Sequence, residues 1–486
     1  MSRVSSILEK KGPLLSGELT SELVKNFLLS PEAARKQISR ATEPVRKLKN
    51  VTFENNQKFL YLDAHFARNS FLDNLIEKLK SDSKAYYYFV KAIINSYGFI
   101  RLNDIPTYSC SPIKPLIGHK LAELIIKDLL LIKVLVDNGD GLLSLNQSVS
   151  FPQNYTRYKA LDLAKKIVIN DFYDWARKIN LVSYNSGKLL NQTPEFHKFQ
   201  WSFTAPSYIH GLHRGSSPGF LVCDVIIGKK VLEEDIEYFL SKVNVINQSK
   251  KHSPFIPVLL IEGIEEKAFL KLKSAGVLLG FIDKLFGSEY LDVLRSLVGI
   301  LENASAVISK NPDKYFELME AFAKLEGKAS NLRGDVFELA VGCYYSQISS
   351  YIEINKLVTD YKSSKSKEID VYVKYPNEVR FVECKGYKYP LDKEYVSKWL
   401  TDNIPTIRNW ALSQDECTHK KHVFELWSTG GFEDSARDLL ENYSKSTNKY
   451  EIKFFGKNEI LKIAKDSKNN NLKRILQNYF SDDFKQ

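Results

Sequence analysis

Cysteine is scarce in this chain of 486 residues. The cysteines are Cys110, Cys223, Cys343, Cys384 and Cys417. An odd number of widely spaced cysteines does not provide a disulfide framework, so the sequence predicts a reducing compartment, most naturally the cytoplasm. The N-terminal segment is also without the uninterrupted apolar core of a signal peptide, which fits that expectation.

Long apolar runs and phosphate-binding loops are lacking as well. The most apolar stretch, residues 121–136, is interrupted by Glu123, Lys127, Asp128 and Lys133. It is too short and too charged to span a bilayer, so we expect a buried helix there and no membrane partner. No Gly-x4-Gly-Lys-Ser/Thr motif is found, which argues against intrinsic nucleotide hydrolysis.

The charge balance is moderately basic. Lys and Arg outnumber Asp and Glu by 69 to 58, giving a net charge of +11, while 44% of the residues are hydrophobic, as in ordinary globular proteins. Residues 1–62 hold eleven Lys/Arg and six Asp/Glu, so much of the surplus lies near the N-terminus. A positive surplus favours polyanionic partners such as nucleic acid, although a generally solvated basic surface is the alternative.

The first 66 residues predict three helices followed by a hairpin. Leu19, Leu23 and Phe27 have the spacing of one helix face. Ser30 is suited to cap the next helix, residues 32–41, which is short and basic. Two alternating segments, 51–53 and 58–62, flank Asn55-Asn56, and Asn tolerates the left-handed backbone of a tight turn.

This order of elements resembles a winged helix-turn-helix. The resemblance implies that the second helix of the motif enters the major groove of duplex DNA. The candidate DNA-contacting residues on that helix are Arg35, Lys36, Gln37 and Arg40. A solvated helix face with no DNA contact is the alternative.

The middle of the chain predicts three further segments. Residues 67–150 repeat the pattern of helices plus a hairpin and form a second helical, winged-helix-like domain, and 151–195 form a helical connector. Residues 196–305 predict an α/β domain, because two apolar strands, 219–227 and 257–261, are joined through a helix and therefore run parallel. Asp224 could be a remnant catalytic acid, but no Glu-x-Lys follows on the next strand, so a non-catalytic domain is favoured.

Residues 306–486 carry the clearest chemical signal. Two segments have the residue pattern of strands: one ends in Asp370 to Val373, and the other ends in Glu383-Cys-Lys385. A Tyr-Pro-Asn turn joins them, which predicts an antiparallel hairpin. Side chains alternate along a strand, so Glu383 and Lys385 share one face and Cys384 lies on the other. Asp370 is expected on the face opposite Ile369 and Val373, next to Glu383.

Two adjacent carboxylates repel each other unless a cation lies between them. Oxygen ligands in small number suit Mg²⁺, which keeps several of its waters, and Mn²⁺ is an acceptable substitute. An ammonium beside that metal can orient the attacking water, while the metal stabilises charge on a phosphoryl oxygen. The pattern therefore predicts phosphodiester hydrolysis.

Asp370 followed by Glu383-x-Lys385 resembles the PD-(D/E)XK motif of restriction-endonuclease-like nucleases. Glu338, on the helix ahead of the hairpin, matches an acid that these enzymes often carry. The resemblance covers about residues 320–460 and implies an α-β-β-β-α-β core, metal binding by Asp370, Glu383 and Glu338, and a nucleophile oriented by Lys385. Ile369 stands where the motif name has Pro, and no Gln-x3-Tyr follows Lys385, which disfavours the exonuclease subgroup.

The sequence thus predicts a multidomain α/β protein that binds and cuts DNA in a Mg²⁺-dependent reaction. The resemblance implies restriction or defence against foreign DNA, and dimerisation, since cutting both strands takes two sites; other defence proteins are possible partners. Two alternatives stay open: a non-catalytic DNA-binding regulator with a nuclease-like scaffold, and an RNA-directed nuclease.

Overall fold

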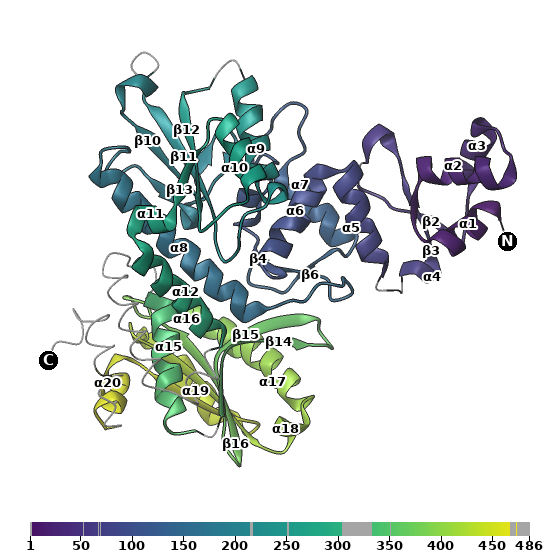
Figure 1. The fold of residues 1–486 in the computed structure, drawn as a ribbon. Coiled ribbons are helices and arrows are strands. Elements are labelled where there is room, and N and C mark those ends of the chain that lie inside the picture. The colour runs from purple at the N-terminus through teal and green to yellow at the C-terminus, as the bar shows by residue number, and fades with distance from the viewer. Residues whose placement is uncertain are drawn as a thin grey trace. The chain divides into compact units, whose positions relative to one another are not determined.

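The computed structural model describes residues 2–51, 53–66, 68, 70–213, 217–249, 252–303, 333–349, 351–466 and 473. The chain forms two compact units: a first unit, Met1–Asn154 with Phe172–Phe281, and a second unit, Tyr155–Asp171 with Ile282–Gln486. Both mix helices and sheets (Figure 1), which confirms the multidomain α/β prediction at this level. The five-part division stays a prediction, and its last boundary, at residue 306, lies outside the described residues. None of the described helices is long and apolar enough to cross a bilayer.

The N-terminal part of the first unit contains three helices and a small sheet. Its elements are α1 (Arg3–Lys11), β1 (Leu14–Leu15), α2 (Ser16–Phe27), α3 (Pro31–Arg40), β2 (Val45–Lys47), η1 (Glu54–Asn56), β3 (Phe59–Leu62) and α4 (Asp63–Phe66), with sheet order β1-β3-β2. Ser30 caps α3 by accepting a hydrogen bond from the Ala33 amide at 3.2 Å, as predicted. Leu19 and Leu23 of α2 are buried in one cluster with Ile38 of α3.

The predicted N-terminal hairpin was wrong in its first strand. β3 pairs with Val45–Lys47, not with residues 51–53. Val51 and Phe53 are nevertheless buried, so their alternation reflects core packing of an irregular segment. Asn55 does adopt a left-handed conformation, with φ of 54°.

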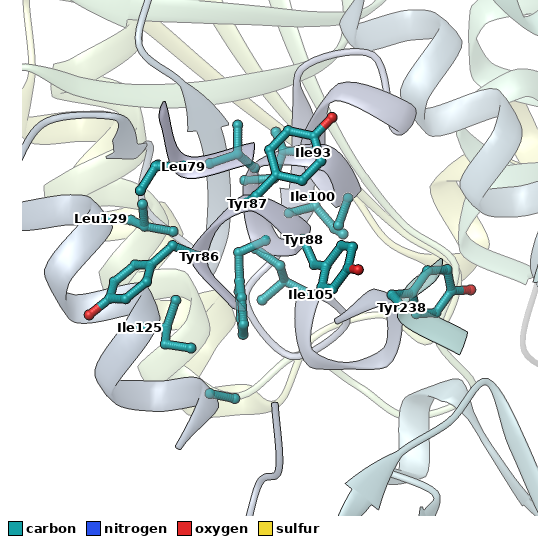
Figure 2. Close-up of a cluster of buried hydrophobic side chains, with 14 of the residues drawn as sticks. Leu79, Tyr86, Tyr87, Tyr88, Ile93, Ile100, Ile105, Ile125, Leu129 and Tyr238 are labelled. Atoms are coloured by element: carbon teal, nitrogen blue, oxygen red, sulfur yellow. The ribbon is translucent and has the colours of Figure 1, made fainter. Parts of the chain in front are cut away.

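The next part of the first unit, up to residue 154, is a helical layer with a second small sheet. Its elements are α5 (Ser70–Asp82), α6 (Lys84–Asn95), β4 (Phe99–Arg101), η2 (Ile105–Tyr108), α7 (Ala122–Leu131), β5 (Leu135–Asp137) and β6 (Leu142–Leu145), with sheet order β4-β6-β5. Figure 2 shows side chains of its core, among them Leu79, Tyr86, Ile93, Ile125 and Leu129. The run 121–136 is thus part helix and part strand within this layer, with α7 packed on α6.

The α/β part of the first unit has a five-stranded sheet of order β13-β12-β11-β10-β7. Its elements are β7 (Lys188–Leu189), η3 (Leu190–Gln192), β8 (Glu195–Phe196), β9 (Phe199–Gln200), β10 (Phe203–Ser207), η4 (His210–Leu212), β11 (Gly219–Ile226), α9 (Glu233–Gln248), β12 (Phe255–Ile261), α10 (Glu266–Ser274) and β13 (Leu278–Phe281). β11 and β12 are parallel, as predicted. Asp224 is fully buried, where it accepts hydrogen bonds from Lys242 at 2.8 Å and from the Ser202 amide, so it has a structural role.

The second unit is built on a five-stranded sheet of order β14-β15-β16-β17-β18. Its elements are the first part of α8 (Tyr155–Lys178), then α11 (Ile282–Phe286), α12 (Ser288–Glu302), α15 (Arg333–Ser346), β14 (Tyr351–Asp360), β15 (Lys365–Lys374), β16 (Glu378–Lys385), α16 (Lys393–Lys398), a π-helical turn (Trp399–Asn403), α17 (Ile404–Leu412), α18 (Asp415–Thr418), β17 (Lys421–Ser428), α19 (Asp434–Ser446), β18 (Glu451–Phe455) and α20 (Lys457–Asp466). β14, β15 and β16 are antiparallel neighbours, whereas β17 and β18 run parallel to β16.

Helices cover both faces of this sheet. α15 packs on one face so closely that a side chain at Gly342 would approach Ile354 to 2.6 Å and Val371 to 3.9 Å. α16, α17 and α19 pack on the other face, in a cluster that contains Tyr372 and Phe381. We refer to these as the α15 face and the α16 face.

The prediction that side chains alternate strictly between the two faces along β15 was wrong at one point. Ile369 packs in the same cluster as Tyr372, on the α16 face, rather than with Val371 on the α15 face. The cause lies in β14, where Asn355 takes a left-handed conformation (φ 57°) between the regular pairs Ile354 to Val371 and Lys356 to Ile369. The alternation of side chains along β15 therefore shifts by one position at Asp370, so Ile369 and Val371 lie on opposite faces of the sheet.

Candidate active site

The site lies where β15 and β16 separate. Their ladder ends at the pair Val371 and Val382, although both strands continue beyond it. At the next position, Oδ2 of Asp370 accepts a hydrogen bond of 2.7 Å from the Cys384 amide, which takes the place of a ladder bond. The Asp370 carboxylate therefore points across toward β16 at the place where the two strands separate.

The structure brings Asp370, Glu383 and Lys385 together. Lys385 Nζ lies 2.7 Å from Glu383 Oε1 and 3.6 Å from Asp370 Oδ2. Asp370 and Glu383 are buried, with 4% and 9% of their surface exposed. A single ammonium thus neutralises part of the charge of two adjacent, desolvated carboxylates.

Tyr395, in the first turn of α16, completes this group on the α16 face. Its hydroxyl donates a hydrogen bond of 2.8 Å to Glu383 Oε1, and its ring centroid lies 6.0 Å from Lys385 Nζ. Asp392 positions the tyrosine, because its side chain caps α16 by accepting from the Tyr395 amide at 2.8 Å. The orientation of Glu383 is therefore fixed by a lysine on its own strand and by a tyrosine on the covering helix.

Glu338 belongs to a second group on the α15 face, centred on Lys159 of α8. Lys159 Nζ lies 2.6 Å from Glu368 Oε1, 3.2 Å from Glu338 Oε2 and 3.0 Å from the side-chain oxygen of Asn355. Tyr155, one turn earlier in α8, donates a hydrogen bond of 2.9 Å to the other oxygen of Glu368. Glu338 is therefore bridged through Lys159 to Glu368, two residues from Asp370.

The protonation states follow from burial and charge. Burial raises the pKa of Asp370 to about 7; Lys385 opposes the rise, and the charges of Glu383 and Glu368 add to it. Burial works against the charged form of Lys385, but Asp370 and Glu383 hold its pKa well above the ordinary value. Lys385 is therefore a fixed cation and hydrogen-bond donor at neutral pH, not a proton acceptor.

Burial also acts on the pKa values of Glu368 and Cys384, with opposite outcomes. Burial alone would raise the pKa of Glu368, but the charge of Lys159 and its hydrogen bond lower it. Burial raises the pKa of the Cys384 thiol well above its usual value, so a thiolate nucleophile is disfavoured at this position.

Three members of the site were missed in the sequence. Glu368 could have been found, because it stands two positions before Asp370 on the same strand. Tyr395 carries a weaker signal as an aromatic residue in the first turn of a helix that follows the motif directly. Lys159 carries none, since more than 200 positions separate it from Glu368.

The predicted DNA-contacting residues lie on α3 in the first unit. Arg35, Lys36 and Arg40 are exposed, and Gln37 is half-buried. Across the part of the chain that the structure describes, these three cations form no ion pair with an acid, whereas Arg46 after α3 is paired with Asp63 at 2.7 Å. Their charge is therefore available to a polyanion; groove contact itself stays a prediction.

The described residues do not form a closed set of metal ligands. Among the described residues, no group of three or more His, Cys, Asp or Glu side chains converges to hold a metal ion. Glu338 is drawn toward Lys159, so the predicted ligands divide into a pair, Asp370 with Glu383, and a third acid held apart by a lysine.

Known proteins give little further information. No protein-family model matches this chain, and no curated protein is similar to it. Among solved structures, protein VC1899 from Vibrio cholerae shares 11% identity over 47% of this chain and 54% of that one, with a TM-score of 0.16. The match thus spans about half the length of that protein, and a similarity this low carries no argument about fold or function.

Proposed function

We propose that the second unit is a Mg²⁺-dependent endonuclease of the PD-(D/E)XK type that hydrolyses phosphodiester bonds in DNA. One observation carries the proposal. Asp370 and Glu383 are buried side by side at the point where two strands separate, with Lys385 Nζ within 3.6 Å of both. A buried acid pair with one lysine has a clear use in binding a divalent cation and a phosphate, because two adjacent carboxylates have no favourable interaction of their own.

The order of elements supports the same reading. A helix, three antiparallel neighbouring strands, a helical segment and a parallel strand succeed one another from α15 to β17. This is the α-β-β-β-α-β order that the resemblance implies. The acids and the lysine stand on the second and third of these strands, where the motif has them.

The residues present fit a magnesium ion. Mg²⁺ is bound in proteins by one or two carboxylates and keeps several waters, so the pair Asp370 and Glu383 suffices, and no closed set of ligands is required. A bound Mg²⁺ would supply an activated water and stabilise negative charge on the phosphate. Lys385, a permanent cation here, would hold and orient the attacking water or a phosphate oxygen. Tyr395 fixes Glu383, and Lys159 holds Glu338 and Glu368 in place.

Duplex binding is proposed for the first unit. Three exposed cations on α3, the helix that follows a tight turn after α2, support it. Because such contacts are made largely to phosphates, affinity should fall steeply with salt. Replacing Arg35 and Arg40 by Ala should lower the salt dependence of duplex affinity by about two in the log–log slope. Lys25→Ala with Lys10→Ala, on α2 and α1, serves as the charge-matched control.

The decisive test is cleavage of a substrate panel with and without Mg²⁺. Labelled duplex DNA, single-stranded DNA and structured RNA should be incubated with the full chain, with Asp370→Ala and with Lys385→Ala. Both variants should lose at least ~100-fold in rate because they remove charge stabilisation at the reacting phosphate, and duplex affinity should stay nearly unchanged because the proposed duplex contacts are on α3 of the first unit. Lys374→Ala is the matched control: Lys374 lies on β15 and pairs with Glu416, outside the site. Unaltered cutting by Lys385→Ala refutes the assignment.

A non-catalytic regulator is the second candidate. The ion pairs of Lys385 with both acids and the bridging of Glu338 by Lys159 favour it, since the same contacts would stabilise a scaffold without metal. It requires duplex binding with no Mg²⁺-dependent cutting of any substrate. Cutting of RNA alone would instead identify an RNA-directed nuclease. Restriction or defence as the setting, and a homodimer as the assembly, are proposed with the DNA endonuclease.

A further inference from the structure

A short segment directly after Lys385 presents two tyrosines to solvent. Tyr387 is 49% exposed and Tyr389 is 79% exposed. Lys388 between them and Pro390 after them are exposed too, whereas Gly386 before them is buried. We call residues 387–390 the tyrosine segment. Large aromatic side chains stabilise a protein when they are buried. Two exposed ones that directly follow a candidate active-site lysine are therefore candidates for ligand contact.

The backbone of this segment is held firmly. Thr429 donates a hydrogen bond of 2.8 Å to the Tyr387 carbonyl through its hydroxyl and one of 3.1 Å to the Lys385 carbonyl through its amide. At the far end, the Leu391 amide donates to the Gly431 carbonyl at 3.0 Å. Gly430 passes so close that an added Cβ would lie 2.1 Å from the Tyr389 carbonyl oxygen. The backbone that carries the tyrosines is therefore fixed, so a ligand that stacks on the rings does not have to order the segment itself.

We propose that Tyr387 and Tyr389 stack on unpaired bases of the strand to be cut, so that the second unit takes single-stranded or locally unpaired nucleic acid. Exposed aromatic rings alternating with a lysine are how proteins hold single strands: every base offers a ring face, and the cation attracts the phosphates between bases. Paired bases in a duplex do not expose their faces to side chains. The segment follows Lys385 directly, so a strand stacked there has its phosphates near the acid pair.

Cleavage of the bound strand rests on the proposed nuclease function, whereas binding of the strand does not. It is tested by fluorescence anisotropy with the full chain in EDTA, which prevents metal-dependent cutting. The probes are labelled single-stranded DNA and RNA of one sequence, the DNA duplex, and an abasic DNA strand of the same length. The variants are Tyr387→Ala, Tyr389→Ala, their double, and the double Phe variant.

We expect each Ala variant to bind single strands ~5-fold more weakly and the double variant ~25-fold, a ~5-fold loss being about 1 kcal/mol, the low end for one stacked base. The Phe variants should bind as the wild type does, because a phenyl ring still stacks. Affinity for the abasic strand and the duplex should not change. Tyr361→Ala is the matched control: Tyr361 is 74% exposed on the same unit, in the turn between β14 and β15.

Other outcomes overturn the stacking role. Equal loss on the abasic strand, or loss in the Phe variants, would show that the hydroxyls bind the backbone. Unchanged single-strand affinity in the double Ala variant would show that the rings bind nothing. Failure of the nuclease is separate: if the Ala variants lose single-strand affinity but the wild type cuts no substrate in Mg²⁺, stacking stands and the proposed function falls. Comparing the affinities for the DNA and RNA strands shows whether the second unit prefers deoxyribose or ribose.

Discussion

Replacing Lys159 by Met should weaken the second unit and change how it responds to pH. The substitution keeps most of the apolar stem and removes the ammonium, which lies 2.6 Å from Glu368, 3.2 Å from Glu338 and 3.0 Å from Asn355. Two carboxylates then remain in place without their shared cation. The cost arises from this uncompensated charge and not from a loss of packing.

The size of the effect follows from burial. Breaking a fully buried ion pair from one side costs about 3–5 kcal/mol. The side chains of Lys159, Glu338 and Glu368 keep 15%, 13% and 25% of their exposure, so water screens part of the charge. We therefore expect a loss of about 2–3 kcal/mol in the free energy of unfolding of this unit. For a unit of this length that corresponds to a Tm lowered by roughly 4–12 °C.

The assay is thermal unfolding followed by the fluorescence of Trp399, Trp410 and Trp427, which belong to the second unit. Trp175 and Trp201 of the first unit would be replaced by Phe in every sample. Lys166→Met is the matched control, because Lys166 is in the same helix and pairs with Asp162 one turn away. Such a pair contributes about 0.3–0.5 kcal/mol. A Lys159→Met variant no less stable than the control would refute the reasoning.

The same variant gives a signed pH dependence. Although burial opposes it, Lys159 lowers the pKa of Glu368 below its ordinary value of 4.5. That interaction contributes stability above pH 4.5 and is lost as the pH falls through the lower, folded-state pKa. The difference between wild type and Lys159→Met should therefore be largest near pH 7 and shrink below pH 4.5. A difference that grows on acidification would mean that Lys159 acts by packing.

Three further predictions address other parts of the chain. Lys242→Met should cost the first unit about 3–5 kcal/mol, because it leaves the fully buried Asp224 charged and unpaired; adding Asp224→Leu should restore part of the loss in a urea titration. Hydrogen bonds from two lysines of β15 lower the pKa of Asp402 to about 2, so Asp402→Asn should cost up to about 1 kcal/mol at pH 6 and only a small part of that at pH 2, as measured by unfolding at each pH. Ser30→Ala should lower stability by about 1 kcal/mol by removing the cap of α3, while Ser39→Ala near the end of that helix should have little effect in the same measurement.

The sequence was most informative where local rules apply. The turn after Lys374 and the alternation of Glu383 and Lys385 predicted the hairpin and the shared face of these two residues, because both depend on neighbours in the chain. The cap at Ser30 is local in the same sense. The first strand of the N-terminal hairpin was misplaced because Val51 and Phe53 alternate as a strand would, yet are buried without pairing.

What the sequence could not predict depends on contacts between distant segments. Lys159 reaches Glu368 and Glu338 only because α8 packs in the second unit, and no spacing rule connects these residues. The facing of Asp370 depends on a left-handed residue, Asn355, on the neighbouring strand. Asparagine adopts this conformation more readily than most residues, but an asparagine inside a strand is not by itself a signal of it.

The irregularity at Asp370 also explains why acids lie on both faces of the sheet at this point. In a regular strand Glu368, Asp370 and Tyr372 would share the α16 face, and Glu338 on α15 would be separated from them by the sheet. Because the backbone changes its facing at Asp370, Glu368 instead lies on the α15 face with Glu338 and Lys159, while Glu383 and Lys385 stay on the α16 face. Four carboxylates, those of Glu338, Glu368, Asp370 and Glu383, then lie around the separating strands, and Lys159 and Lys385 are ammonium groups that contact them. Buried carboxylates that lie side by side, such as Asp370 and Glu383, repel each other unless a proton or a cation lies between them. Burial, to which the charges of Glu383 and Glu368 add, raises the pKa of Asp370 to about 7, so this carboxyl binds a proton more readily than an ordinary aspartate does. Asn355→Gly should preserve the facing of β15, whereas Asn355→Val, which disfavours a left-handed backbone, should restore regular alternation and disperse the acids.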